Sequence, residues 1–211
     1  MYIELIDLLR CPVEHEETWL VASFDRMEGR FIVAGKLGCP VCSATYEIID
    51  GIPRFSSAQM PGNDPECSDE DVIRTAALLN LTRPDSLAVL CGSEAMSANR
   101  VSEMTQARIV ALNPGSHVEE TERVAVVTCE RRIPLASASV DAIALGDAAS
   151  LVHDAPRILR SGGRISADSS TELGAQFREI ARDERHAIVG PTTVLKQLGQ
   201  DRKLLRRSVL G

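Results

Sequence analysis

The feature that most constrains this chain is a pair of cysteines separated by two residues, Cys39-Pro40-Val41-Cys42. Two thiolates at this spacing can bind one tetrahedral zinc ion from a single turn, and Cys11 supplies a third thiolate upstream. The fourth ligand is either Glu14 or His15. We favour His15, because imidazole is the commoner zinc ligand and tolerates the longer gap from Cys11. The sequence therefore predicts a metal site formed by Cys11, His15, Cys39 and Cys42.

Two apolar runs between these cysteines predict a β-hairpin that brings them together. Trp19–Phe24 and Arg30–Ala34 are separated by residues 25–29, which contain a glycine and suit a five-residue hairpin loop. Ile3–Leu9 has the helical spacing of apolar residues and is stopped by Pro12. So small a unit buries little apolar surface, and a bound metal would contribute folding free energy directly. We expect residues 1–55 to form a zinc ribbon.

Two other interpretations of this unit remain open. The ribbon could lack a metal and be held by the packing of its aromatic residues, which are Trp19, Phe24, Phe31 and Tyr46. The Cys39 and Cys42 pair could instead be a redox dithiol, although the strand-to-helix context of such a pair is missing. Metal content separates the redox interpretation from the zinc ribbon, because stoichiometric zinc would occupy both thiols.

The cysteine motifs and the residues that follow them resemble a known family. Leu8–Pro12, Cys39–Cys42 and Tyr46–Pro53, which ends in Asp-Gly-Ile-Pro, are similar to the small zinc-ribbon proteins that bind and activate methyltransferases acting on tRNA, ribosomal RNA and translation factors. Glu14 departs from this pattern, because many members carry a cysteine there. The resemblance implies a protein partner for residues 1–55, either a methyltransferase or a second copy of this chain in a homodimer.

Composition restricts the other partners. A formal net charge of −7 argues against tight, non-specific binding to nucleic-acid phosphates, and we expect no DNA partner. RNA contact through the basic stretch Arg202–Arg207 stays open. No stretch approaches the roughly 20 apolar residues of a membrane span, and the first residues lack the basic region of a secretion signal. We therefore expect a cytoplasmic protein with no membrane partner.

Residues 56–84 are predicted to be a linker followed by a helix. Ser56–Asp71 is rich in proline, glycine and acidic residues and cannot bury a core. Val72–Leu81 then has helical apolar spacing, and the acidic residues just before it are favourably placed for the N-terminus of a helix.

From residue 85 onward, short apolar runs alternate with helical ones, which predicts βαβ units with a parallel sheet. We expect strands at Leu87–Leu90, Arg108–Leu112, Val124–Thr128, Ala142–Leu145 and Arg164–Ala167. We expect helices at Ala95–Met104, Ala149–Leu159 and Glu172–Arg185, then a short helical run at Thr193–Leu198 and a closing strand within Lys203–Leu210. The predicted fold class is α/β, with a Rossmann-like, doubly wound, mostly parallel sheet over residues 85–211 and a ligand cleft beyond the carboxyl ends of its first strands.

Four strings in this half resemble the class I methyltransferases that use S-adenosylmethionine. Val89–Ser93 is similar to their first strand and glycine loop, and Val110–Pro114 to the end of their second strand. Ile133–Ile143 and Ile158–Ile165 are similar to the segments that lead into their fourth and fifth strands. The resemblance implies an S-adenosylmethionine site in which Gly92, Ser93 and Asn113 contact the cofactor.

The same pattern lacks most of the residues that would hold this cofactor. Glu94 stands where the methionine portion would pass, and Cys129 where an acid would approach the adenine. Asn113 replaces an acidic ribose ligand, a loss on the order of 1–3 kcal/mol. We therefore expect a degenerate, non-catalytic methyltransferase homologue that acts as a binding scaffold or methyltransferase activator, with no catalytic residue. The alternative is an active S-adenosylmethionine-dependent methyltransferase with a divergent cofactor pocket.

Overall fold

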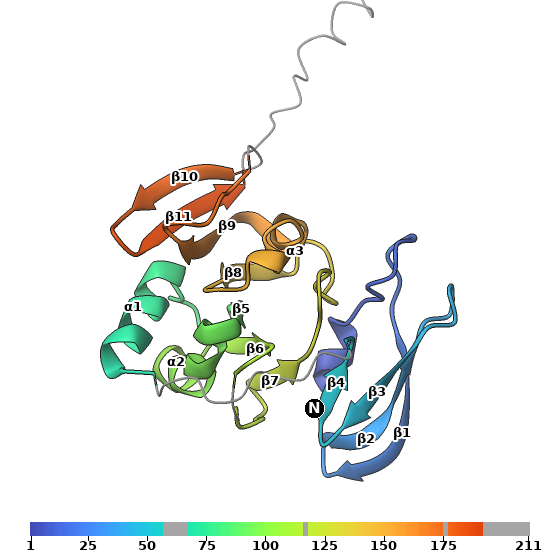
Figure 1. Ribbon diagram of the computed structural model, residues 1–211. Coiled ribbons are helices and arrows are strands. Elements are labelled where there is room, and N and C mark those ends of the chain that lie inside the picture. The colour runs from blue at the N-terminus through green and yellow to red at the C-terminus, as the bar shows by residue number, and fades with distance from the viewer. Residues whose placement is uncertain (57–66, 116–117, 175–176, 192–211) are drawn as a thin grey trace, which may run out of the picture.

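The computed structural model describes residues 1–56, 67–115, 118–174 and 177–191. Within these ranges the chain forms two sheets, a four-stranded sheet in the order β1-β2-β3-β4 and a seven-stranded sheet in the order β10-β11-β9-β8-β5-β6-β7 (Figure 1). None of the helices in these ranges combines the length and the apolar character that a bilayer span requires.

The smaller sheet is the antiparallel ribbon. It consists of β1 (Val21–Glu28), β2 (Phe31–Gly38), β3 (Thr45–Ile49) and β4 (Ile52–Arg54), and the short 3₁₀ helix η1 (Ile3–Asp7) precedes it. The predicted hairpin is present, but the predicted loop over residues 25–29 is wrong. β1 continues to Glu28 through two register shifts and pairs that residue with Phe31 across a tight turn at Gly29. The polar side chains of this stretch are exposed, so its composition resembles a loop while its backbone stays paired.

A second tight turn, Asp50-Gly51, joins β3 to β4. Both residues have positive φ angles, 49° and 84°, between the paired Ile49 and Ile52, as a two-residue type I′ hairpin requires. A Cβ on Gly51 would also lie 2.2 Å from Glu120 Oε2 in the second half of the chain. The Asp-Gly-Ile-Pro motif is therefore a point of close contact between the ribbon and the larger sheet.

The larger sheet has five parallel strands and one antiparallel hairpin at its edge. The parallel strands are β5 (Leu87–Cys91), β6 (Arg108–Leu112), β7 (Val124–Val127), β8 (Val140–Ala144) and β9 (Leu159–Asp168). β11 (His186–Pro191) pairs antiparallel with β9, and β10 (Phe177–Arg182) pairs antiparallel with β11. The spatial order β7-β6-β5-β8-β9 is the doubly wound order, which reverses direction at β5. The predicted α/β fold class is confirmed.

Two of the predicted helices are present, and a third is much shorter than predicted. α1 (Asp69–Leu79) and α2 (Ala98–Thr105) match the expected helices, and the 3₁₀ helix η2 (Gly92–Ser97) leads into α2. The predicted helix at Ala149–Leu159 is reduced to the 3₁₀ helix η3 (Ala149–Leu151) and α3 (Ala155–Ile158), because Leu159 already begins β9.

The predicted helix at Glu172–Arg185 is wrong, because its centre is strand β10. Phe177 and Ile180 have helical spacing in the sequence, but pairing with β11 at the sheet edge overrides this local preference. The predicted elements at Thr193–Leu198 and Lys203–Leu210 lie outside the described residues.

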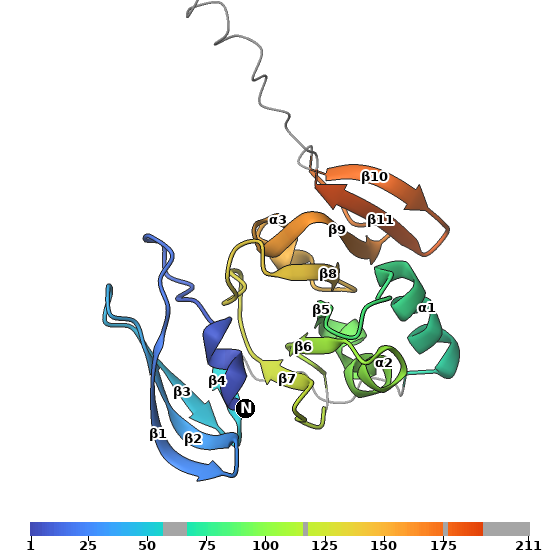
Figure 2. The same cartoon turned by 180° about the vertical axis from the view of Figure 1, so that it is seen from behind.

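The two faces of the larger sheet are covered differently. On one face, Ala88 and Leu90 of β5 pack in a core with residues of α1 and α2 such as Leu79 and Val101. On the other face, Leu87 and Val89 belong to a core that includes residues of α3 and many of the ribbon, among them Leu5, Leu9, Ile32 and Ile48. Figures 1 and 2 show the ribbon and η1 beside β7. The ribbon thus shares one continuous core with the larger sheet.

The backbone also joins the ribbon to the sheet. Thr128, which directly follows β7, donates its N–H to Pro53 O over 3.2 Å, and its carbonyl accepts the N–H of Phe55 over 2.9 Å. Arg54 and Thr128 form a parallel bridge at this point. β4 therefore lies alongside the end of β7, where an uncovered strand edge could otherwise pair with another chain.

Candidate metal centre and ligand crevice

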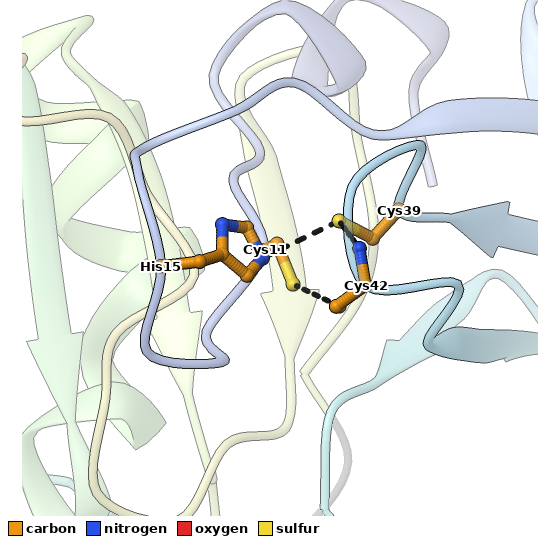
Figure 3. A group of neighbouring side chains, drawn as sticks. All are labelled: Cys11, His15, Cys39 and Cys42. Atoms are coloured by element: carbon orange, nitrogen blue, oxygen red, sulfur yellow. Dashed lines mark hydrogen bonds between the residues drawn. The ribbon is translucent and has the colours of Figure 1, made fainter.

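The structure brings Cys11, His15, Cys39 and Cys42 together at the end of the ribbon (Figure 3). Their sulfur and nitrogen donor atoms all lie within 4.8 Å of one another. Cys39 and Cys42 come from the knuckle between β2 and β3, whereas Cys11 and His15 come from the loop between η1 and β1. Two loops that face each other thus each contribute two donors, as a structural zinc site requires.

The spacing of the donors fits a tetrahedral ion. With Zn–S bonds of about 2.3 Å and a Zn–N bond of about 2.0–2.1 Å, a tetrahedron separates two sulfurs by about 3.8 Å and a sulfur and a nitrogen by about 3.5 Å. Cys11 Sγ lies 3.7 Å from Cys42 Sγ, and Cys39 Sγ lies 3.4 Å from His15 Nε2. Zinc is therefore compatible with these four residues.

Groups around the donors orient them. His15 Nδ1 lies 2.6 Å from the carbonyl oxygen of Glu16, a contact that leaves Nε2 facing the cysteines. The Tyr46 hydroxyl lies 3.4 Å from Cys11 Sγ. Glu14, the other candidate for the fourth ligand, is exposed and is not a member of this group.

The knuckle favours a charged Cys39. Burial opposes ionisation of this thiol, but hydrogen bonds from the backbone N–H groups of Cys42 and Val41 outweigh burial and lower its pKa to about 6. Burial raises the pKa of Cys11, which faces it. A thiolate is the form that binds a metal, so the knuckle is prepared for an ion at neutral pH.

The second candidate site is the crevice at the carboxyl ends of β5 and β8, where the strand order reverses. Gly92 follows β5 with φ +53°, and a Cβ there would lie 2.2 Å from Asp147 Oδ1. The same carboxylate oxygen accepts the backbone N–H of Ser93 over 2.9 Å and its hydroxyl over 3.2 Å. The backbone N–H of Ser93, which a ligand in this crevice could have used, is thus bonded to Asp147.

Asn113, another predicted contact with a cofactor, is also bonded within the protein, as is Glu94, which was expected to obstruct the methionine portion. The side-chain amide of Asn113 donates to Cys129 O over 2.8 Å and accepts the N–H of Cys129 over 2.9 Å. Both ends of this amide therefore join β6 to the segment after β7. Glu94 accepts the hydroxyl of Thr75 in α1 over 2.8 Å, which holds its side chain toward that helix.

A cavity of about 800 Å³ lies beside Asp147, between the ends of β8 and β9 and the β10–β11 hairpin. Ser93, Glu94, Asp147, His153, Asp168 and His186 are among the residues that line it, whereas Gly92 and Asn113 are not. Sequence reasoning missed Asp147 and Asp168. The position of Asp147 shortly after the predicted strand at Ala142–Leu145 was the available signal, because ligand-binding residues gather at the carboxyl ends of such strands.

The two cysteines near the crevice are buried thiols. Burial raises the pKa of Cys129 to about 12 and raises that of Cys91 well above its ordinary value. Both stay protonated at neutral pH, and neither is suited to act as a nucleophile.

No protein-family model matches this chain, and no curated protein matches it. Among solved structures, a SAM dependent methyltransferase from Aquifex aeolicus is 13% identical with a TM-score of 0.42, over 57% of this chain and 90% of that chain. Geranyl diphosphate methyltransferase, solved in complex with GPP and sinefungin, is 16% identical with a TM-score of 0.38, over 46% of this chain and 44% of that chain. The YcgJ protein from Bacillus subtilis is 13% identical with a TM-score of 0.37, over 47% of this chain and 50% of that chain.

This chain thus covers half or less of the length of the last two proteins. Because none of these three TM-scores exceeds 0.42, the fold class rests on the strand order described above.

Proposed function

We propose that this chain is a non-catalytic, methyltransferase-like binding protein whose zinc ribbon is docked on its own α/β domain. The observation that carries the proposal is the position of Asp147. Its carboxylate lies against Gly92 and accepts two hydrogen bonds from Ser93, so that a charged side chain of the protein stands in the crevice where doubly wound folds bind their ligands.

The neighbouring residues support the same conclusion. A nucleoside cofactor would need a hydrogen-bond partner for its ribose. The side-chain NH₂ and oxygen of Asn113 are both already hydrogen-bonded to the backbone of Cys129. Freeing them would leave a buried backbone group unpaired, which costs about 1–3 kcal/mol. The wider cavity on the β9 side still offers space for a ligand of another kind, which supports a binding role.

The ribbon side of the proposal concerns its partner. β4 lies against the end of β7 within the same chain, and the ribbon shares its core with the larger sheet. These contacts support a ribbon that packs against the α/β domain of its own chain. A second protein, either a methyltransferase or another copy of this chain, would then bind to a different surface of the molecule.

Calorimetric titration of the full chain with S-adenosylmethionine and with S-adenosylhomocysteine tests the proposal. We expect no binding up to about 1 mM, a limit that corresponds to about −4 kcal/mol. Micromolar binding of either compound would overturn the non-catalytic assignment.

The second candidate function is an active S-adenosylmethionine-dependent methyltransferase with a divergent pocket. The cavity of about 800 Å³ at the carboxyl ends of the strands favours it, because small-molecule sites commonly have volumes of roughly 300–1,000 Å³. This candidate requires transfer of a labelled methyl group to RNA, protein or a small molecule from a cell extract. Incubation with each fraction distinguishes it from the binding protein.

A further inference from the structure

The segment between β7 and β8 is held from both sides. Figures 1 and 2 both place it between the ribbon and α3. On the ribbon side, Arg10 donates its N–H to Pro134 O over 3.0 Å, and Ala136 donates its N–H to Leu8 O over 2.9 Å. Leu9 and Leu135, both fully buried, form the antiparallel bridge between these two bonds. Cys11, a member of the metal centre, directly follows Arg10 in the sequence.

The loop that carries the metal donors makes a second contact with the same segment. Glu17 lies between His15 and the bridge that Arg10 forms with Trp19, so its position depends on how the loop is closed. Its carboxylate accepts the backbone N–H of Ser137 over 3.1 Å and the hydroxyl of Ser137 over 2.5 Å.

Arg157 of α3 holds the segment from the other side. Its guanidinium donates to Leu135 O over 2.7 Å and to Ile133 O over 2.5 Å. It also pairs with Asp154, which accepts the N–H of Ile133 over 2.7 Å. The carbonyl of Arg157 accepts the N–H of Ala138 over 2.9 Å.

The far end of this series of contacts is the cavity. Val152 and His153, two to three residues before the start of α3, line its wall. Hydrogen bonds therefore connect the chain on both sides of Cys11 and His15, through residues 133–139, with α3, and the residues shortly before α3 line the cavity. α2, on the opposite face of the sheet, belongs to a separate core and makes none of these contacts.

We infer that metal occupancy at the Cys11, His15, Cys39 and Cys42 centre controls the order of residues 133–139 and of α3, so that the cavity wall is fully formed only in the metal-loaded protein. The physical reason is that the two donors from the Cys11–Thr18 loop fix that loop, which presents Glu17 to the segment and follows directly after the bridged Leu9 and Arg10. Without the ion, the Arg10–Trp19 bridge still closes the base of the loop, but the rest of the loop loses its restraint, and the support that Glu17 gives to the segment weakens. The inference rests on the metal centre of the proposed function and deepens it.

Residue-resolved hydrogen exchange on the full chain tests it, with zinc bound and after removal of zinc by a chelator. The amides of Ala136 and Ser137 report direct contact with the ribbon, and those of Ala138 and Ser139 report the side bonded to α3. We expect chelation to increase exchange of all four by at least about fivefold while the amides of α2 change less than about twofold. An increase confined to residues 1–55, or an equal increase in α2, overturns the inference.

A pair of neighbouring variants identifies the connection. In Glu17→Ala we expect zinc content to stay at the native level, whereas Ala138 and Ser139 exchange faster even with zinc bound and respond little to chelation. Glu16→Ala is the matched control and should respond as the native protein does, because only the backbone carbonyl of Glu16 contacts His15. A native response in Glu17→Ala overturns the inference.

Zinc content measured on the same samples separates two failures. Protein that binds no zinc contradicts the proposed metal centre, and the inference fails with it. Protein that binds zinc without a change at Ala138 and Ser139 contradicts the inference alone. S-adenosylmethionine titration is independent of both results.

Discussion

The carboxylate of Asp147 lies so close to Gly92 that a Cβ on residue 92 would be 2.2 Å from Asp147 Oδ1. In a methyltransferase-like pattern this glycine is read as making room for a cofactor. Here it makes room for a side chain of the same protein, across the point where the strand order reverses. The glycine therefore has a structural reason to be present that does not involve a ligand.

Replacement of Gly92 by alanine should be costly for this reason. The positive φ alone costs about 1–2 kcal/mol, and the clash with Asp147 adds about 1–3 kcal/mol. Gly162→Ala is the matched control, because Gly162 also has a positive φ but has open space around it. Urea denaturation should show the larger loss for Gly92→Ala, and an added Asp147→Ala should reduce that loss to the level of the control. Equal losses in the two single variants would show that Asp147 does not restrict residue 92.

Restoring the acid of the methyltransferase pattern should harm the protein. In Asn113→Asp the carboxylate can still accept the N–H of Cys129 but cannot donate to its carbonyl, so we expect a loss of about 1–3 kcal/mol in the free energy of unfolding. Asn80→Asp is the control, because Asn80 is an exposed helix C-cap whose φ of +53° is close to the +50° of Asn113. The measurement is urea denaturation, paired with S-adenosylmethionine titration. An Asn113→Asp variant as stable as the native protein would contradict this prediction.

The metal centre predicts about one zinc ion per chain when the purified protein is analysed by mass spectrometry. Cys42→Ser and His15→Ala should each lower the zinc content and the melting temperature, because the binding free energy of a structural metal is folding free energy. Cys67→Ser should change neither, since Cys67 lies outside the group of donors. Full zinc content in Cys42→Ser would exclude the proposed ligand set.

The N-cap of α1 gives a prediction with a pH dependence. Ser68 accepts the N–H of Asp71 and donates its hydroxyl to the Asp71 carboxylate, and this bond lowers the pKa of Asp71 below its ordinary value of 3.8. Ser68→Ala should lower the free energy of unfolding by about 1 kcal/mol at neutral pH.

The sign of the pH dependence follows from the direction of the shift. A carboxyl with a lowered folded-state pKa contributes stability above its unfolded-state pKa and loses that contribution as the pH falls through the folded-state value. The difference between Ser68→Ala and the native protein should therefore shrink below pH 3.8. Thr82→Ala, in the exposed turn after α1, should show no such change in urea denaturation at the same pH values. A difference that grows on acidification would contradict the assigned direction.

The parts of this protein that depend on short-range pattern were predictable. Apolar runs marked the five parallel strands, because a strand buried on both faces is a nearly continuous apolar segment. The spacing of Cys39 and Cys42, with Cys11 upstream, marked the group of donors, and the preference for His15 over Glu14 agrees with where the structure places His15. That these residues bind zinc stays a prediction.

Other features could not be predicted, because their partners are far away in the sequence. Glu17 meets Ser137 at a separation of 120 residues, and Ser93 meets Asp147 at a separation of 54. The helical spacing of Phe177 and Ile180 predicted a helix, yet pairing with β11 made this segment a strand.

The sequence by itself determined the fold class, the strands of the parallel sheet and the Cys39–Cys42 knuckle, because each depends on spacing within a few residues. Only the tertiary structure decided that the ribbon packs on its own α/β domain, that the Asp147 carboxylate lies against Gly92, and that Asn113 is hydrogen-bonded to Cys129. The physical reason is that such contacts depend on how distant segments pack into one core, and no local pattern specifies which of them will meet.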